Sequence, residues 1–306
     1  DNILPTGFLT TTRQVVGNTT TYKRVTTTRK VARLVAYGRA AVQRSVEGVE
    51  EVPVKLMHSF ESIAHKPWIL MALQSQVDYD KTLAQTEISR ETGLFAQLFD
   101  NLRLAAIYSA LANGYVWFDG NGDLLSSSSG AVTTVDMAIP TGWKGKLDAT
   151  EITNVTAGKW SASATDIPLQ IEEIKAKVAK ECGYELAYAF YGKDIISNLL
   201  GNTLVGKMLT NNGVLQTALQ SYSIPDGFLG LKWRPVNRAF YDKAGTLTDF
   251  FASDAVTFTP EPSLDWWEII EGSYYVPTGV GAYGTAVEAL RSLTTAFGKF
   301  SYAEVT

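Results

Sequence analysis

The stretch from Val135 to Asn202 decides the fold class of this chain. Its segments are, in order, VDMAIP at 135–140, KWS at 159–161, DIP at 166–168, LAYAF at 186–190 and DIISNLL at 194–200. The DIP segment predicts the start of a helix, because an Asp side chain accepts amide hydrogen bonds there and proline is tolerated in the first turn. The LAYAF run predicts a buried strand between that helix and a second, shorter one. The fold class predicted is α+β.

Composition sets broad limits. The chain has 306 residues, a hydrophobic fraction of 45% and a net charge of -4, which excludes a disordered protein and a nucleic-acid binder that is basic over its whole surface. One cysteine cannot form an internal disulfide, and no Cys and His spacing fits a zinc site. No apolar run approaches the roughly 18 residues of a membrane span, and no signal peptide pattern is present. We expect a soluble protein made inside the cell; whether a leader precedes Asp1 stays open.

The N-terminal residues 1–30 carry clusters of threonine and little helical periodicity, so we expect an extended arm. A series of basic residues from Arg13 to Arg44 precedes Glu47, and Asp1 is the only acidic residue before that glutamate. This segment is either a solvated tail or an arm that docks on a neighbouring subunit or faces DNA. The candidate contact residues in the arm and the following loop are Arg13, Lys23, Arg24, Arg29, Gly38, Arg39, Arg44 and Glu47.

Between residues 31 and 60 the apolar residues alternate along the chain. One run includes Val31 and Val35, the other includes Val52 and Leu56, and a polar tip lies near 44–48. This pattern predicts a long β-hairpin. An isolated two-stranded ribbon is only marginally stable in water, so the pattern also indicates a partner subunit.

Apolar residues then recur at helical spacing from about Asp80 to Asn113. We expect Asp80 to be the N-cap and Gly114 to end the helix in a left-handed conformation. About 30 residues at ~1.5 Å each give a rod of about 45 to 50 Å. Gly93 costs roughly 1 kcal/mol relative to alanine and predicts a bend.

The remaining polar motifs favour structural roles. Asp119, Asn121 and Asp123 are spaced as in a calcium loop, but Gly130 stands where the bidentate Glu belongs, which favours an ordinary turn. In the helix from Ile167, early glutamates and later lysines at 175, 177 and 180 match the helix dipole. The spacing of Cys182 predicts a buried structural thiol.

No catalytic constellation is evident. His58 and His65 lie in no recognisable motif, so we expect no enzyme activity, no cofactor and no metal site. The alternative is a nucleotide-binding cytosolic enzyme that uses the Gly-x-Gly-x-x-Gly motif at 279–284, although no further βαβ units follow it. The pairs Trp266–Trp267 and Tyr274–Tyr275 are expected in the core or at a subunit contact.

The order of these segments resembles the lambda-type major capsid protein family of tailed phages (phage major capsid protein E family). The resemblance extends from about Val31 onward. It rests on YGR at 37–39, PVK at 53–55, the helix after Asp80, VDM at 135–137, WS at 160–161 with Asp166 and Pro168, FY at 190–191 to Leu200, and GKFSYA at 298–303.

This resemblance implies the Hong-Kong-97-type phage capsid fold. Its expected parts are an N-terminal arm at 1–30, an E-loop at 31–75, a peripheral domain at 76–159 and 255–306, and an axial domain at 160–254. The implied function is to build an icosahedral shell of pentamers and hexamers around double-stranded DNA, in the virion after assembly in the host cytoplasm. Implied partners are further copies of the chain, scaffold, portal and decoration proteins and packaged DNA, with no membrane. An encapsulin-like nanocompartment shell is the alternative within the same fold.

Overall fold

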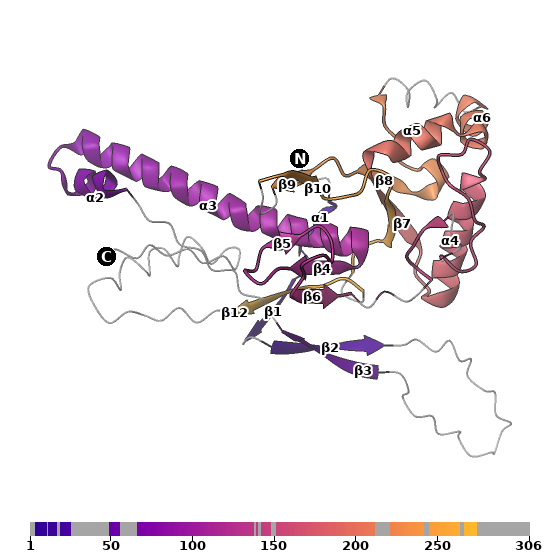
Figure 1. Ribbon diagram of the computed structural model, residues 1–306, viewed down its shortest axis with the longest axis horizontal. Helices are drawn as coiled ribbons and strands as arrows, with labels where there is room; N and C mark the ends of the chain where they lie inside the picture. The colour runs from indigo at the N-terminus through magenta and orange to yellow at the C-terminus, as the bar shows by residue number, and fades with distance from the viewer. Residues whose placement is uncertain are drawn as a thin grey trace, which may run out of the picture. The chain divides into compact units, whose positions relative to one another are not determined.

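The computed structural model describes residues 4–10, 12–16, 19–25, 49–55, 66–137, 139, 142–147, 151–211, 221–241, 245–263 and 266–273 (Figure 1). The chain divides into two compact units. Unit 1 contains residues 1–10, 62–267 and 301–306, and unit 2 contains 11–61 and 268–300. Several sequence predictions lie outside the described residues, namely those for Arg29, Gly38, Arg39, Arg44, Glu47, His58, His65, Tyr274, Tyr275 and the glycine motif at 279–284.

Strand β7 (Leu186–Tyr191) is the centre of the main sheet of unit 1. It pairs antiparallel with β11 (Val256–Pro260) and parallel with β8 (Lys232–Pro235). Five of its six residues are buried, as expected for an uncharged run that is hydrogen-bonded on both edges. The sequence prediction of a buried strand here is confirmed.

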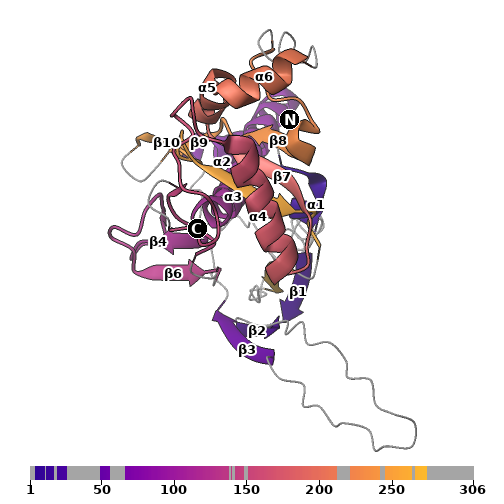
Figure 2. The same ribbon diagram turned by 90° about the vertical axis from the view of Figure 1, so that its right-hand side faces the viewer.

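Helix α4 (Ile167–Glu181) lies alongside β7 (Figures 1 and 2). The Asp166 side chain accepts a hydrogen bond from the amide of Leu169 at 3.0 Å, so the predicted cap is confirmed. Gly183 terminates the helix with a φ of 82°, because glycine adopts this left-handed conformation without a Cβ clash. Cys182 is only half-buried, so the prediction of a buried thiol is wrong. The residue caps the helix, at the margin of the apolar stripe.

Two further helices complete this layer, α5 (Lys193–Gly201) and α6 (Thr203–Asn211). Asn202 joins them and is buried. Its Oδ1 accepts hydrogen bonds from the amides of Leu204 and Val205 at 3.1 Å each, and its Nδ2 donates to the carbonyl of Thr165 at 2.8 Å. These hydrogen bonds satisfy a buried side-chain amide, which would otherwise cost about 1–3 kcal/mol.

Helix α3 (Asp78–Asn113) is a rod of 36 residues, preceded by the shorter α2 (Pro67–Gln74), which contacts it. Gly114 ends α3 with a φ of 70°, as predicted. The predicted N-cap is wrong: the helix begins at Asp78, two residues before Asp80. Asp80 lies in the first turn, where a negative charge also stabilises the helix dipole, and it accepts a hydrogen bond from the Ser75 hydroxyl. Gly93 lies within the helix without interrupting it (Figure 1).

A second sheet packs on the C-terminal half of α3. It consists of β5 (Leu124–Leu125), β4 (Tyr115–Phe118) and β6 (Thr133–Asp136) in that order. The turn after β4 is closed by the Asp119 carboxylate, which accepts hydrogen bonds from the amides of Asn121 and Asp123 at 2.7 and 3.0 Å. This is the geometry of an ordinary Asx turn. A hairpin of β9 (Ala239–Tyr241) and β10 (Leu247–Asp249) and a single 3-10 turn, η2 (Phe228–Gly230), complete the unit.

The first described residues of the chain belong to the core of unit 1. A short helix, α1 (Thr6–Thr10), buries Phe8 completely, with its ring edge-on to Tyr188, Phe190, Trp266 and Trp267. The prediction of an extended arm is therefore wrong for this segment, since one helical turn is too short for a periodic pattern. The prediction that Trp266 and Trp267 lie in the core is confirmed for this aromatic cluster.

Unit 2 contains two separate strand pairs. Strand β1 (Thr12–Val16) runs parallel to β12 (Ile269–Ser273), and β2 (Thr19–Val25) runs antiparallel to β3 (Val49–Lys55). The expected hairpin is thus corrected: residues 49–55 pair with 19–25 and not with 31–35. Alternation alone could not fix this register, because the threonine-rich run at 19–21 also suits a strand.

Gly192 supplies the first test of this fold. A Cβ at this position would lie 2.1 Å from the carbonyl oxygen of Ala252 and 2.7 Å from that of Ser253, both backbone atoms. We expect Gly192→Ala to destabilise the protein by at least about 2–3 kcal/mol, as overpacking against backbone does. Gly206→Ala is the matched control, because nothing lies within 4 Å of its added Cβ inside α6. Urea unfolding of both variants measures the difference; equal midpoints would contradict the close approach at Gly192.

Candidate functional site

The N-terminal half of α3 exposes large apolar side chains on one face. Tyr79 and Leu98 are 75% and 54% exposed, and Leu83 and Leu94 are exposed between them. The neighbouring α2 adds exposed Trp68 and Met71. Single exposed apolar residues are common, but a row of them along a helix is typical of an interaction surface. This exposed row on α3 is the candidate functional site.

An ion pair lies in the middle of this row. Arg90 Nε donates to Glu87 Oε2 at 3.0 Å, and a second guanidinium nitrogen lies 2.5 Å from Oε1. The hydrogen bond from Arg90 lowers the pKa of the Glu87 carboxyl, so that it stays ionised as the pH falls. Within one helix such an exposed pair contributes little to stability. Its charges are therefore available for recognition.

The predicted contact residues are placed as follows. Arg13 lies on β1, and its Nε is 2.6 Å from Glu268 Oε1, an ion pair whose N–H does not meet hydrogen-bond geometry. In the β2–β3 register Lys23 is opposite Glu51 and Arg24 is opposite Glu50. The other five candidates lie outside the described residues. The intersubunit role of these residues stays a prediction.

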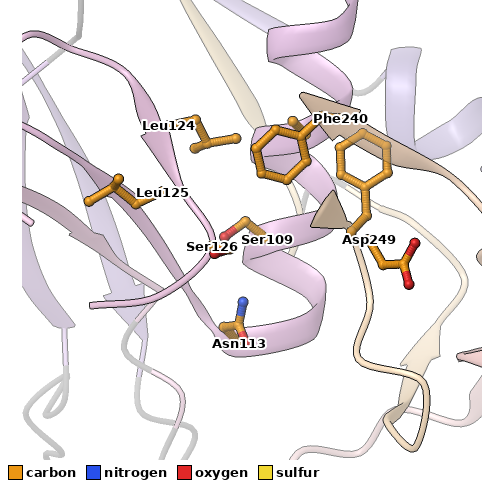
Figure 3. Close-up of a pocket in the computed structure, with 9 residues that line it drawn as sticks. Ser109, Asn113, Leu124, Leu125, Ser126, Phe240 and Asp249 are labelled. Carbon is orange, nitrogen blue, oxygen red and sulfur yellow. The ribbon is translucent and has the colours of Figure 1, made fainter. Parts of the chain in front are cut away.

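A small hollow lies between α3, β5 and β9 (Figure 3). Figure 3 shows Ser109 and Asn113 on the helix, with Leu124 and Phe240 across from them. Its volume of about 20 Å³ has room for roughly one water molecule. A wider, open depression of about 410 Å³ is lined by Lys193, Asp249 and backbone-rich residues of 250–255. The hollow is thus too small for a nucleotide or other organic ligand.

Within the described ranges no group of three or more His, Cys, Asp or Glu residues could hold a metal ion. In the same part of the chain no helix has the length and hydropathy needed to cross a membrane.

Sequence reasoning missed a polar stripe on α4. Four residues at spacings of three, four and four bond the loop that precedes the helix. Trp160 Nε1 donates to Gln170 Oε1 at 2.8 Å, and the hydroxyl and amide of Thr156 donate to Glu173. Trp143 Nε1 donates to Glu181 at 2.6 Å. The fourth member is Lys177, whose position in the sequence predicts only a charge that matches the helix dipole.

Lys177 is 7% exposed, and its ammonium group donates to three oxygens. These are the carbonyls of Gly142 and Thr153, at 2.6 and 2.8 Å, and the Thr153 hydroxyl at 2.7 Å. Three acceptors match the three N–H bonds of an ammonium group. The lysine therefore holds two parts of the loop on α4.

We expect Lys177→Met to destabilise the protein by about 2–4 kcal/mol, because the flexible apolar side chain leaves two buried carbonyls without a donor. Lys180→Met on the exposed side of the same helix is the control and should change stability by less than about 0.5 kcal/mol. Limited proteolysis should then cut the Lys177→Met variant within residues 142–156 first. Equal stability of the two variants would contradict the clamp.

Comparisons with known proteins give a structural likeness at low sequence identity. No protein-family model and no curated protein sequence matches the chain. A crystal structure described as that of "the putative capsid protein of prophage (E.coli CFT073)" is similar to it, with a TM-score of 0.45 and 15% sequence identity. The likeness covers 78% of this chain and 68% of that one.

Proposed function

We propose that this chain is the major capsid protein of a tailed phage, a structural protein without enzymatic activity that assembles into an icosahedral head shell around double-stranded DNA. The proposal starts from the family resemblance in the sequence, which joins a basic arm, a hairpin, a long helix and the segment at 135–202 in one order. The described elements that correspond to it are the β2–β3 ribbon, α3, and the α4–β7–α5 series.

The observation that carries the proposal is the large apolar row on α3 that the chain leaves exposed. Tyr79, Leu83, Leu94 and Leu98 are between 48% and 75% exposed in the single chain. Full burial of such a side chain at a contact stabilises association by roughly 1.5–3 kcal/mol. A protein that works alone gains nothing from this exposure, whereas a subunit of a shell does.

The described strand pairs of unit 2 support the same conclusion. Each consists of two strands only, and parallel pairs in particular are normally found inside larger sheets. Contacts with neighbouring copies would stabilise them. Contacts between different surfaces of identical subunits close into rings, and many modest contacts together make a stable shell.

The proposal includes the partition into an arm, E-loop, peripheral domain and axial domain. Strand β11 lies in the proposed peripheral range and pairs with β7 of the proposed axial range, so these two domains would share one sheet. Scaffold, portal and decoration proteins are the proposed partners, with the virion as the proposed location. Basic residues of the arm would contact packaged DNA without sequence specificity.

The decisive measurement is the state of the purified full-length chain. We expect closed particles built from pentamers and hexamers in negative-stain electron microscopy and a fast-sedimenting species in the ultracentrifuge. Enclosed DNA distinguishes a phage head from an encapsulin-like compartment, which would enclose protein. A chain that stays monomeric at all concentrations and salt conditions, with a co-expressed scaffold protein present, would sink the proposal.

A second prediction concerns Arg39 and Arg44, which have no acidic neighbour in the sequence before Glu47 although the whole subunit is acidic. In the proposed shell they meet carboxylates of an adjacent subunit. Such exposed pairs contribute only ~0–1 kcal/mol each, so their effect comes from repetition over the shell. Arg39→Glu with Arg44→Glu should therefore weaken assembly and leave the circular dichroism of the subunit unchanged. Particles as resistant to heat and salt as the parent's would rule out this contact.

A further inference from the structure

The exposed row on α3 has a symmetric order. Including the central ion pair it consists of Tyr79, Leu83, Glu87, Arg90, Leu94 and Leu98. The spacings between them are four, four, three, four and four residues, and are therefore the same from either end. The midpoint lies between Ile88 and Ser89. About this point each apolar residue has an apolar counterpart, and the acid has a base.

Helical geometry places the six residues on one face. At about 100° per residue they fall within a sector of roughly 100° of the helix circumference. From Tyr79 to Leu98 the row is about 28 Å long at ~1.5 Å per residue. A second helix laid along α3 could thus contact all six positions together.

Orientation decides whether the charges of two such helices match. When a second copy of α3 runs antiparallel about the midpoint, Tyr79 faces Leu98 of the other copy and Leu83 faces Leu94. Glu87 of each copy then faces Arg90 of the other, which gives two ion pairs. A parallel arrangement would place Glu87 against Glu87 and Arg90 against Arg90, which is repulsive.

We propose that this face of α3 is a two-fold docking surface for a second copy of the same chain, with the two helices antiparallel and crossing between residues 88 and 89. A two-fold contact uses the same patch on both partners, so it requires a patch that is complementary to itself. The symmetric order of apolar and charged residues meets that requirement. The inference rests on the proposed self-association and adds to it: ring contacts use different surfaces, and this contact joins two rings.

The contact is small for a protein interface. One pair of half-helices buries less than the roughly 1,200 Å² of a stable complex. It therefore forms weakly between free subunits and gains strength when rings present several copies of it at once.

Orientation is tested by cysteine crosslinking in a Cys182→Ser background, which removes the only native thiol. A mixture of Leu83→Cys and Leu94→Cys chains should form disulfide dimers, because positions 83 and 94 face each other across the two-fold. Either variant alone should not, since its two cysteines lie about 16 Å apart along the helices. Gln85→Cys mixed with Ala96→Cys is the matched control: the separation of eleven residues is the same, and both positions are exposed on the other side of α3.

Charge complementation is the second test. Glu87→Arg and Arg90→Glu should each reduce the crosslinking of 83 to 94 by at least tenfold when carried on both chains, because like charges then meet twice. Mixing Glu87→Arg chains with Arg90→Glu chains should restore it. Neither of these chains contains the ion pair within its own helix, so restoration can come only from contacts between copies. Gln85→Arg should leave the yield unchanged.

The outcomes separate this inference from the proposed shell. Efficient dimers of Leu83→Cys alone would establish a parallel contact and overturn the inference. A yield equal to the 85–96 control, or no reaction of Leu83→Cys with a thiol reagent because its own chain covers it, would overturn it as well. Particles without the 83–94 crosslink would reject the two-fold contact and keep the shell, whereas crosslinked dimers that never form particles would do the reverse.

Discussion

Strand β7 is the element on which the rest of unit 1 depends. It is hydrogen-bonded to β11 and β8 on its two edges, and Ala189 and Phe190 are fully buried. A strand without free edges or free faces fixes the positions of its neighbours, because every shift exposes apolar surface or breaks a ladder. On one side the Phe8 ring contacts Phe190, and α4 packs against the strand through its apolar stripe. The short uncharged run at 186–191 thus organises elements from both ends of the chain.

Helix α4 transmits this order to a segment with almost no regular structure. Its apolar side, with Ile171 and Val178, packs into the main hydrophobic core, while Gln170, Glu173, Lys177 and Glu181 bond the loop before it. The loop of 142–160 is therefore positioned by side chains of one helix and not by a sheet. Such a loop keeps a defined shape only while its hydrogen bonds are complete.

The sequence was sufficient where local chemistry decides the structure. The Asp166 cap, the buried run of β7 and the left-handed stop at Gly114 depend on residues within a few positions of each other. It was insufficient where distant residues decide. The partner of β3 is set by pairing across some 30 residues, Phe8 is buried by Trp267 at the far end of the chain, and Lys177 is neutral in pattern until Gly142 and Thr153 surround it. The periodic apolar pattern predicts the helix α3 but not the candidate site on it, because periodicity cannot tell which side is left exposed.

The pairing of the two ends of the chain has a consequence for biosynthesis. Phe8 needs Trp266 and Trp267 to complete its environment, and β1 has β12, more than 250 residues later, as its described neighbour. Chains are made from the N-terminus at about 5–20 residues per second, so these first residues wait roughly 10–50 seconds for their partners. During translation the nascent subunit is therefore incomplete at its beginning. Its α3 helix and main sheet can form earlier, and the last step of folding is the closure of its first residues onto its last described strands.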